Sequence, residues 1–181
     1  TRVLHCLAII KFERGGSVDL DTRDLDIAAI TDAVGRVLPF QKHPTRAVLG
    51  ERLSVSVPDQ NSYLQIRYRT SPRASGLQWL TPAQTRSEHP FLFSQGEPLH
   101  ARSYVPCQDT PSLRFTFAGQ LTVPKDLRGL MGAKHVLREV KGDQAVEYWN
   151  MPHPIPAYLI ALAVGELASC DITERSRVWA A

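Results

Sequence analysis

The chain has 181 residues, of which 43% are hydrophobic and 22% charged, and these proportions fit one ordinary globular domain with a real core. Its 21 lysines and arginines exceed its 18 acidic residues only slightly, and they are scattered, which argues against nucleic acid or an anionic membrane as a partner. The longest apolar stretch, residues 155–168, contains Pro156, Gly165 and Glu166 and is shorter than the roughly 18 to 20 residues of a membrane span. We therefore expect a soluble protein.

The cysteines and the start of the chain suggest its setting. Cys6, Cys107 and Cys170 are odd in number and widely spaced, which disfavours a disulfide framework and gives no Cys-x-x-Cys pair. A reducing, cytoplasmic location is the simplest interpretation. The chain opens at Thr1 within an apolar, strand-like run and without a leader, so we expect it to be an excised piece.

Alternation of apolar and polar residues, with period two, is the main structural signal along the chain. In chain order it predicts strands over residues 3–12, 53–57, 64–68, 113–123 and 146–148. Turn-forming residues separate these strands at positions 15–16, 58–61, 71–72 and 142–143. No internal repeat or low-complexity linker is evident.

Two segments are less clear. Residues 26–37 contain helix formers, yet Ile27, Ile30 and Val34 could equally belong to a strand. Residues 157–164 are apolar throughout, and the flanking Pro156 and Gly165 favour a buried strand over a short core helix. The pattern as a whole predicts one all-β domain over residues 1–181, a saddle-like sandwich of two or more mostly antiparallel or mixed sheets.

Polar residues and backbone breakers gather most densely over residues 94–111. If that segment is extended, Gln95 and Glu97 lie two residues apart and present an amide and a carboxylate on one face. Such a pair suits a positively charged, hydrogen-bonding ligand such as a free amino terminus. Glu97 could instead be a solvated loop carboxylate or a partner of Arg102, while Asp109 could accept a turn hydrogen bond or pair with Arg102.

Other catalytic arrangements are missing from the sequence. The six histidines include no pair at the i, i+4 spacing with the adjacent glutamate of a helical zinc site, so we expect surface or edge histidines. There is no Gly-x-Ser-x-Gly elbow and no glycine-rich phosphate loop. Cys107 has no adjacent base and is interpreted as a small buried thiol. We therefore assign no catalytic and no metal-binding residue within this chain.

Several blocks together resemble one known family. The chain is similar, over essentially its whole length and in order, to the amino-terminal domain of the leukotriene A(4) hydrolase and aminopeptidase B group, zinc aminopeptidases of gluzincin form. The matching blocks are LQWLTPAQT at 77–85, HPFLFSQ at 89–95, PCQDTPS at 106–112, PIPAYLIAL at 154–162, LDTRDL at 20–25 and RSRVW at 175–179.

The resemblance implies a β-rich, saddle-shaped domain that packs against a thermolysin-like catalytic domain and walls one side of its cleft. It also implies that Gln95 and Glu97 hold the free α-amino group and first residue of a peptide substrate, with Arg102 and Asp109 as structural support. The family's epoxide hydrolases have Gln at the position of Glu97, so Glu97 favours aminopeptidase activity. Cys6 stands where the family usually has Gly, and the strand that normally precedes it is missing here.

The family's Gly-x-Met-Glu-Asn loop, its His-Glu-x-x-His helix and its catalytic Tyr do not occur in this sequence. The resemblance therefore implies that the zinc belongs to a catalytic domain outside this chain, which we expect to hold no cofactor itself and to be inactive alone. The partners expected are a peptide with a free amino terminus and the enzyme's own catalytic domain. The alternative is a non-catalytic β-sandwich module for protein interaction, derived from the same family.

Overall fold

Strands dominate the computed structural model, which describes residues 2–57, 63–174 and 176–180. The strands form five sheets, and every strand pairing within them is antiparallel. The all-β prediction is confirmed. The expected turn at residues 58–61 lies outside the described residues.

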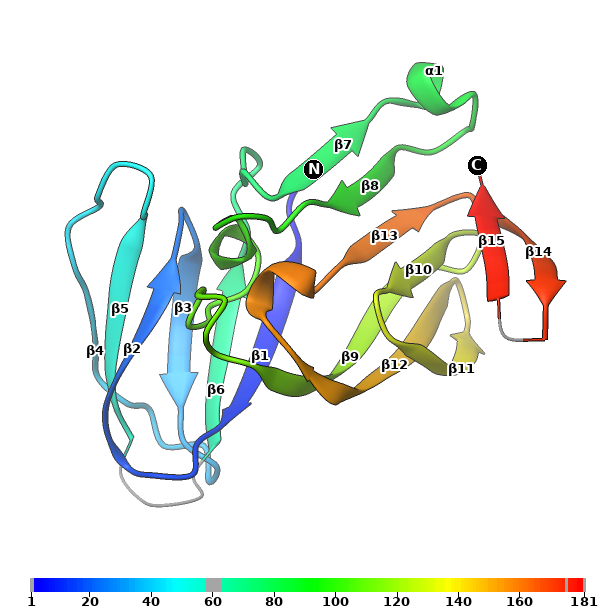
Figure 1. The fold of residues 1–181 in the computed structure, drawn as a ribbon. Helices are drawn as coiled ribbons and strands as arrows, with labels where there is room; N and C mark the ends of the chain where they lie inside the picture. The colour runs from blue at the N-terminus through cyan, green and yellow to red at the C-terminus, as the bar shows by residue number, and fades with distance from the viewer. Residues whose placement is uncertain (1, 58–62, 175, 181) are drawn as a thin grey trace.

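The amino-terminal part is a sandwich of two three-stranded sheets, seen on the left of Figure 1. Residues alternate between exposed and buried along its strands, so that one face of each sheet contributes to a shared core that includes Leu20, Leu53, Leu64 and Ile66. One sheet has the order β1 (His5–Lys11), β6 (Tyr63–Arg69), β3 (Asp26–Thr31), and the other has the order β2 (Gly16–Thr22), β5 (Glu51–Val57), β4 (Phe40–Lys42).

The rest of the chain forms three further sheets on the right of Figure 1. The first has the order β10 (Arg128–Met131), β13 (Leu162–Gly165), β8 (Phe91–Ser94), β7 (Leu77–Leu80). The second has the order β11 (Lys134–Lys141), β12 (Gln144–Ile155), β9 (Phe115–Pro124), and the third is the hairpin of β14 (Ala168–Thr173) and β15 (Ser176–Ala180).

Among the described residues there are also three short helical segments: α1 (Pro82–Thr85), η1 (Ala101–Ser103) and η2 (Ala157–Leu159). The prediction of one strand over 157–164 is wrong in its first half. Leu159 N–H donates to the Pro156 carbonyl and Ile160 N–H to the Ala157 carbonyl, so the chain makes a 3-10 turn before β13 begins. The ambiguous segment at 26–37 resolves into β3 followed by a turn.

The segment between β8 and β9 joins the sandwich to the other sheets. Tyr104 in this segment is buried with Leu92 and Ala157 in a second core, while its main-chain carbonyl accepts a 2.8 Å hydrogen bond from Tyr68 of the sandwich. Burial raises the pKa of the Tyr68 hydroxyl well above its ordinary value, so it remains a hydrogen-bond donor. Tyr104 therefore attaches this segment to both parts of the fold, and the segment carries the candidate site.

Candidate functional site

The Gln95–Glu97 segment begins where β8 ends and is fixed by its backbone. Gln95 N–H donates to the Gly76 carbonyl at 2.9 Å, and the Gly96 carbonyl accepts from His100 N–H at 2.8 Å, which closes a turn over residues 97–100. The Glu97–Pro98 peptide bond is cis. These contacts define the path of the chain on both sides of Glu97.

Gly96 is held against two tyrosines. A Cβ atom at this position would lie 2.5 Å from the Tyr158 carbonyl oxygen and 2.7 Å from the Tyr104 hydroxyl oxygen, so only glycine fits. The Tyr104 hydroxyl in turn donates to the Ile160 carbonyl at 2.7 Å, and burial raises its pKa well above the ordinary value. Gly96 is thus buried, whereas its two neighbours in the sequence, Gln95 and Glu97, are exposed.

Gln95 and Glu97 line one pocket of about 250 Å³. Its other wall is remote in sequence and consists of Tyr158 and Leu159 in η2 and of Ile160 and Ala161 directly after it. In the described part of the chain, no hydrogen bond or ion pair engages the Glu97 carboxylate. An exposed carboxylate beside an amide, above a partly apolar pocket, can bind a cationic donor such as an ammonium group.

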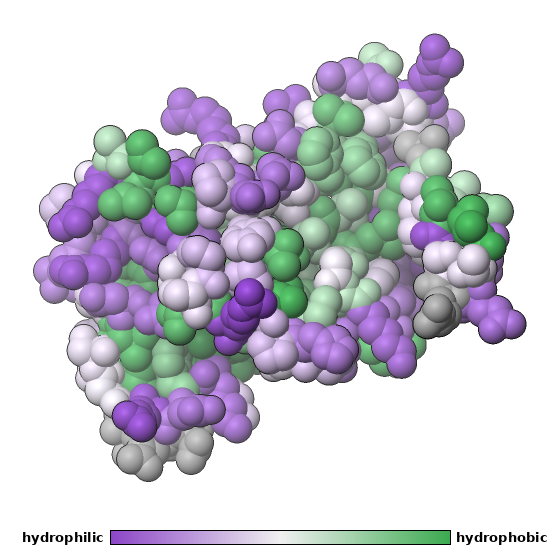
Figure 2. Space-filling view, viewed as in Figure 1, coloured by the Kyte–Doolittle hydropathy of each residue, from purple (hydrophilic) through white to green (hydrophobic). Residues whose placement is uncertain are grey.

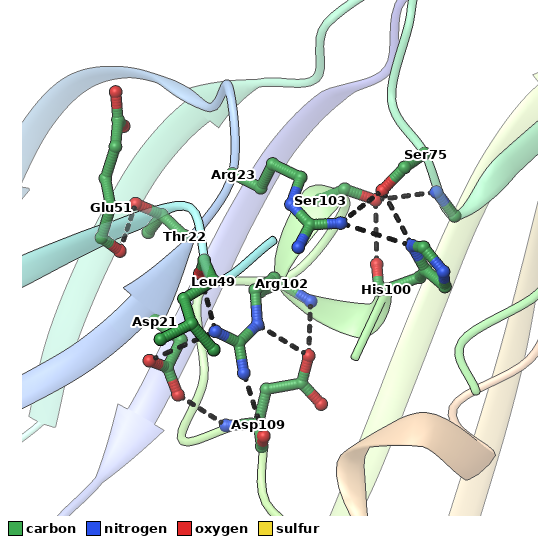
Figure 3. A network of polar contacts seen from close by, with 11 residues as sticks. Asp21, Thr22, Arg23, Leu49, Glu51, Ser75, His100, Arg102, Ser103 and Asp109 are labelled. Atoms are coloured by element: carbon green, nitrogen blue, oxygen red, sulfur yellow. Dashed lines mark hydrogen bonds and ion pairs between the residues drawn. The ribbon is translucent and has the colours of Figure 1, made fainter. Parts of the chain in front are cut away.

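Arg102 does not contact Glu97 but pairs with Asp109, and both residues are only 3% exposed (Figure 3). Arg102 Nε lies 3.0 Å from Asp109 Oδ2, and the same oxygen accepts the Arg102 main-chain N–H at 3.2 Å. Arg102 Nη1 donates to the Leu49 carbonyl at 2.6 Å and lies 3.4 Å from Asp21 Oδ1. Asp21 Oδ2 accepts the Asp109 N–H at 2.9 Å, so this network fastens η1 to the edge of the sandwich.

A second polar network, also shown in Figure 3, continues from η1 toward the pocket. Arg23 Nη1 lies 3.0 Å from Ser75 Oγ and 3.3 Å from His100 Nδ1, and those two acceptor groups are 2.9 Å apart. Ser103 Oγ donates to the His100 carbonyl at 2.7 Å and accepts Gly76 N–H at 2.8 Å. His100, expected at the surface or at a strand edge, is in fact half-buried in this network.

Cys107 lies beside this network without a reactive environment. It is buried, and its main chain forms a bridge with Asp21, with N···O distances of 2.7 and 3.3 Å. Burial raises the pKa of its thiol, and the nearby carboxylates of Asp109 and Asp21 raise it further. The thiol therefore stays protonated at neutral pH, which is unsuitable for a nucleophile.

One group of potential metal ligands was not evident from the sequence. Glu88, His89 and Glu166 place one ligand atom each within 4.8 Å of one another. Glu166 Oε2 already accepts the Glu88 N–H at 2.8 Å, which accounts for part of this convergence. Two carboxylates and one imidazole, of which only the Glu88 carboxylate belongs to an exposed residue, differ from the nitrogen- and sulfur-rich sets of structural zinc, and no chemical step is assigned to the group.

A buried carboxylate, Glu147, was also missed. It is 0% exposed and accepts hydrogen bonds from Arg128 Nε at 2.8 Å, Arg138 Nη1 at 2.5 Å and His135 Nε2 at 2.8 Å. Burial acts to raise its pKa, but the hydrogen bonds from Arg138, Arg128 and His135 outweigh burial and lower it. The cluster ties β10, β11 and β12 together and lies apart from the pocket.

The fold and pocket define a multi-sheet β domain that presents an amide and a carboxylate at its surface. The sequence model of one protein family, the Peptidase M1 N-terminal domain, matches residues 11–159, so the chain belongs to this family. The resemblance seen in the sequence is thereby confirmed.

Named relatives agree with this family. Across 90% of its length, the chain is 37% identical to a leukotriene A-4 hydrolase of Xenopus laevis and 33% identical to a leucine aminopeptidase 2 of Candida glabrata. It covers 28% and 25% of those proteins, so it spans about a quarter of the length of these relatives. No helix in residues 2–57, 63–174 or 176–180 is long and apolar enough to span a membrane.

Solved structures show the same fold. The match to the structure of native yeast LTA4 hydrolase covers 98% of this chain and 28% of the yeast chain, with a TM-score of 0.86 and 31% sequence identity. The structure of an M1 zinc metallopeptidase from Deinococcus radiodurans covers 97% of this chain and 42% of the other chain, with a TM-score of 0.71 and 19% identity. The second likeness concerns the fold alone.

Proposed function

We propose that this chain is the domain of a zinc-dependent aminopeptidase that recognises the amino end of the substrate. In this proposal Gln95 and Glu97 hold the free α-amino group and the first residue of a peptide. The observation that carries it is the shared pocket, where the Glu97 carboxylate is exposed and unpaired within the described structure although the surrounding backbone is fixed.

The chemistry of the pocket suits this role. A carboxylate facing an ammonium group forms a charge-assisted hydrogen bond, which is about twice as strong as a neutral one. The Gln95 amide oxygen can accept a second ammonium proton. A peptide whose amino terminus is blocked would lose both interactions, so the pair would select for unblocked ends.

The catalytic step itself is proposed to belong to the remaining part of the enzyme. There, bound zinc would supply a Lewis acid and an activated water, and this domain would position the end of the peptide. Figure 2 shows apolar side chains gathered over the region of β7, β8 and β13, which is a suitable surface for packing against a catalytic domain. The cysteines of the described chain are unpaired, which supports the proposed cytoplasmic setting.

Kinetics of the full-length enzyme test this proposal. Glu97→Ala should lower kcat/KM for peptides with free amino termini, by an amount that corresponds to about 2 to 5 kcal/mol of lost binding free energy, the usual cost of removing one member of a desolvated charge pair. Competitive inhibitors with and without the α-amino group give a second readout, because only those that carry the amine should bind the variant more weakly.

Glu13→Ala is the matched control, since Glu13 is an exposed carboxylate in the turn between β1 and β2. Its kinetics should equal those of the wild type. Unchanged kinetics for Glu97→Ala, or an equal loss of inhibitors that lack the amine, would contradict the proposal and favour a non-catalytic interaction module.

A further inference from the structure

The wall of the pocket that faces the Gln95–Glu97 segment is uncharged. It is formed by residues 158–161, of which Leu159 is 49% exposed while Ile160 is 5% exposed and packs in the second core. Among the described residues that line the pocket, Glu97 alone carries a charge. One side of the pocket is therefore suited to an ammonium group and the other to an uncharged group.

Hydrogen bonds hold the two walls together. Leu162 N–H, directly after residues 158–161, donates at 2.9 Å to Ser94 Oγ, and Ser94 belongs to the opposite wall. The Ile160 carbonyl accepts the Tyr104 hydroxyl at 2.7 Å. The main chain that carries Leu159 is thus positioned relative to the opposite wall by the fold.

The pocket has room for one residue of a peptide. Its volume of about 250 Å³ lies below the roughly 300 to 1,000 Å³ of pockets that enclose drug-sized ligands. The α-amino group and the side chain of an amino acid are bonded to the same carbon atom. If Gln95 and Glu97 hold the amino group, the side chain of that same residue is therefore the group that reaches the wall with Leu159.

That wall distinguishes between side chains by their polarity. An aliphatic side chain against Leu159 removes apolar surface from water, and one methylene group in an apolar pocket changes selectivity by about tenfold or more. A charged side chain would lose part of its hydration there without gaining a partner of opposite charge on that wall. A negatively charged one would also be repelled by Glu97.

We propose that Leu159 is a specificity-determining residue: the side chain of the peptide's first residue packs against it, and it selects for uncharged, aliphatic first residues. This inference rests on the function proposed for Gln95 and Glu97. Leu159 does not hold the ammonium group, so it determines which first residue is preferred and not whether a free amino end is required.

Two substitutions of opposite charge in the full-length enzyme test this role. We would measure kcat/KM for unblocked dipeptides that begin with leucine, lysine or glutamate and share their second residue. Leu159→Glu should raise the lysine-to-leucine ratio of kcat/KM about fivefold, as expected for one exposed ion pair, and Leu159→Lys should raise the glutamate-to-leucine ratio by a similar factor. A purely structural role would lower all three values together and would not reverse with the sign of the charge.

Leu7 provides the matched control, because it is 45% exposed and lies on β1, outside the pocket. Leu7→Glu and Leu7→Lys should keep the wild-type ratios. A smaller change, Leu159→Ala, should reduce the leucine-to-alanine ratio about tenfold, and it keeps the test decisive if the charged variants do not fold.

Unchanged ratios in the folded Leu159 variants, shifts in the same direction for both charges, or equal shifts in the Leu7 variants would overturn the inference. Glu97→Ala separates it from the function proposed above. If Glu97→Ala lowers kcat/KM for all three dipeptides while the ratios of the Leu159 variants stay at the wild-type values, only the role of Leu159 fails. If Glu97→Ala has no effect, the proposed function fails, and the inference fails with it.

Discussion

Removing the Asp109 carboxylate should destabilise the domain strongly, because it leaves a buried arginine without its main partner. In Asp109→Ala the Arg102 Nε and the Arg102 main-chain N–H both lose their acceptor, Asp109 Oδ2. Breaking a buried pair typically costs about 3 to 5 kcal/mol. The lower end applies here, because Asp21 Oδ1 remains 3.4 Å from Arg102 Nη1 and the Leu49 carbonyl remains bound to it. A loss of about 3 kcal/mol corresponds to a fall in Tm of about 6 to 12 °C for a domain of this size.

Urea unfolding of the 181-residue chain, followed by tryptophan fluorescence, measures this cost. Asp26→Ala is the control, since the Asp26–Arg69 pair has side chains that are 60% and 57% exposed and should contribute less than about 1 kcal/mol. A double variant, Arg102→Met with Asp109→Leu, should cost less than the sum of the single changes, because it leaves no uncompensated charge. A loss below about 0.5 kcal/mol for Asp109→Ala, or additive single changes, would refute the reasoning.

Two other changes have definite expectations. Gly96→Ala would place Cβ 2.5 Å from the Tyr158 carbonyl oxygen and 2.7 Å from the Tyr104 hydroxyl oxygen. We therefore expect this change to destabilise the protein by about 1 to 3 kcal/mol, which would appear as a lower midpoint of urea unfolding. A midpoint equal to that of the wild type would contradict this expectation. The lowered pKa of Glu147 means that its carboxylate stabilises the fold above the ordinary glutamate value of about 4.3, and that this contribution is lost as the pH falls through the lowered value. Glu147→Gln should therefore destabilise the protein more at pH 7 than at pH 3, and a difference independent of pH would argue against it.

The long strands could be predicted because each has enough residues to show alternation. The 113–123 pattern became β9 (Phe115–Pro124), and the 53–57 and 64–68 patterns lie within β5 and β6. The four-residue strands β7, β8 and β13 are too short for a period to be visible, and they form because their neighbours in the sheet supply hydrogen bonds.

The site was only partly accessible from the sequence. Gln95 and Glu97 stood out because polar residues and breakers cluster around them, but the pocket wall at 158–161 is more than 60 residues away along the chain. His100 was misjudged for the same reason, since its partners Arg23 and Ser75 lie 77 and 25 residues from it. Contacts of such long range follow from the packing of sheets and not from any local pattern.

Stability and recognition can be separated in this arrangement. The backbone next to Glu97 is held by the hydrogen bonds of Gln95 N–H and of the Gly96 carbonyl. The Glu97 carboxylate, in contrast, has no protein partner in the described chain. Removing that carboxylate should therefore leave unfolding unchanged and alter only the binding of amino ends. Asp109→Ala should alter both, because the pair that it breaks anchors η1, which directly follows the turn that carries Glu97. A change in unfolding for Glu97→Ala comparable to that for Asp109→Ala would mean that Glu97 is part of the framework and not a binding group.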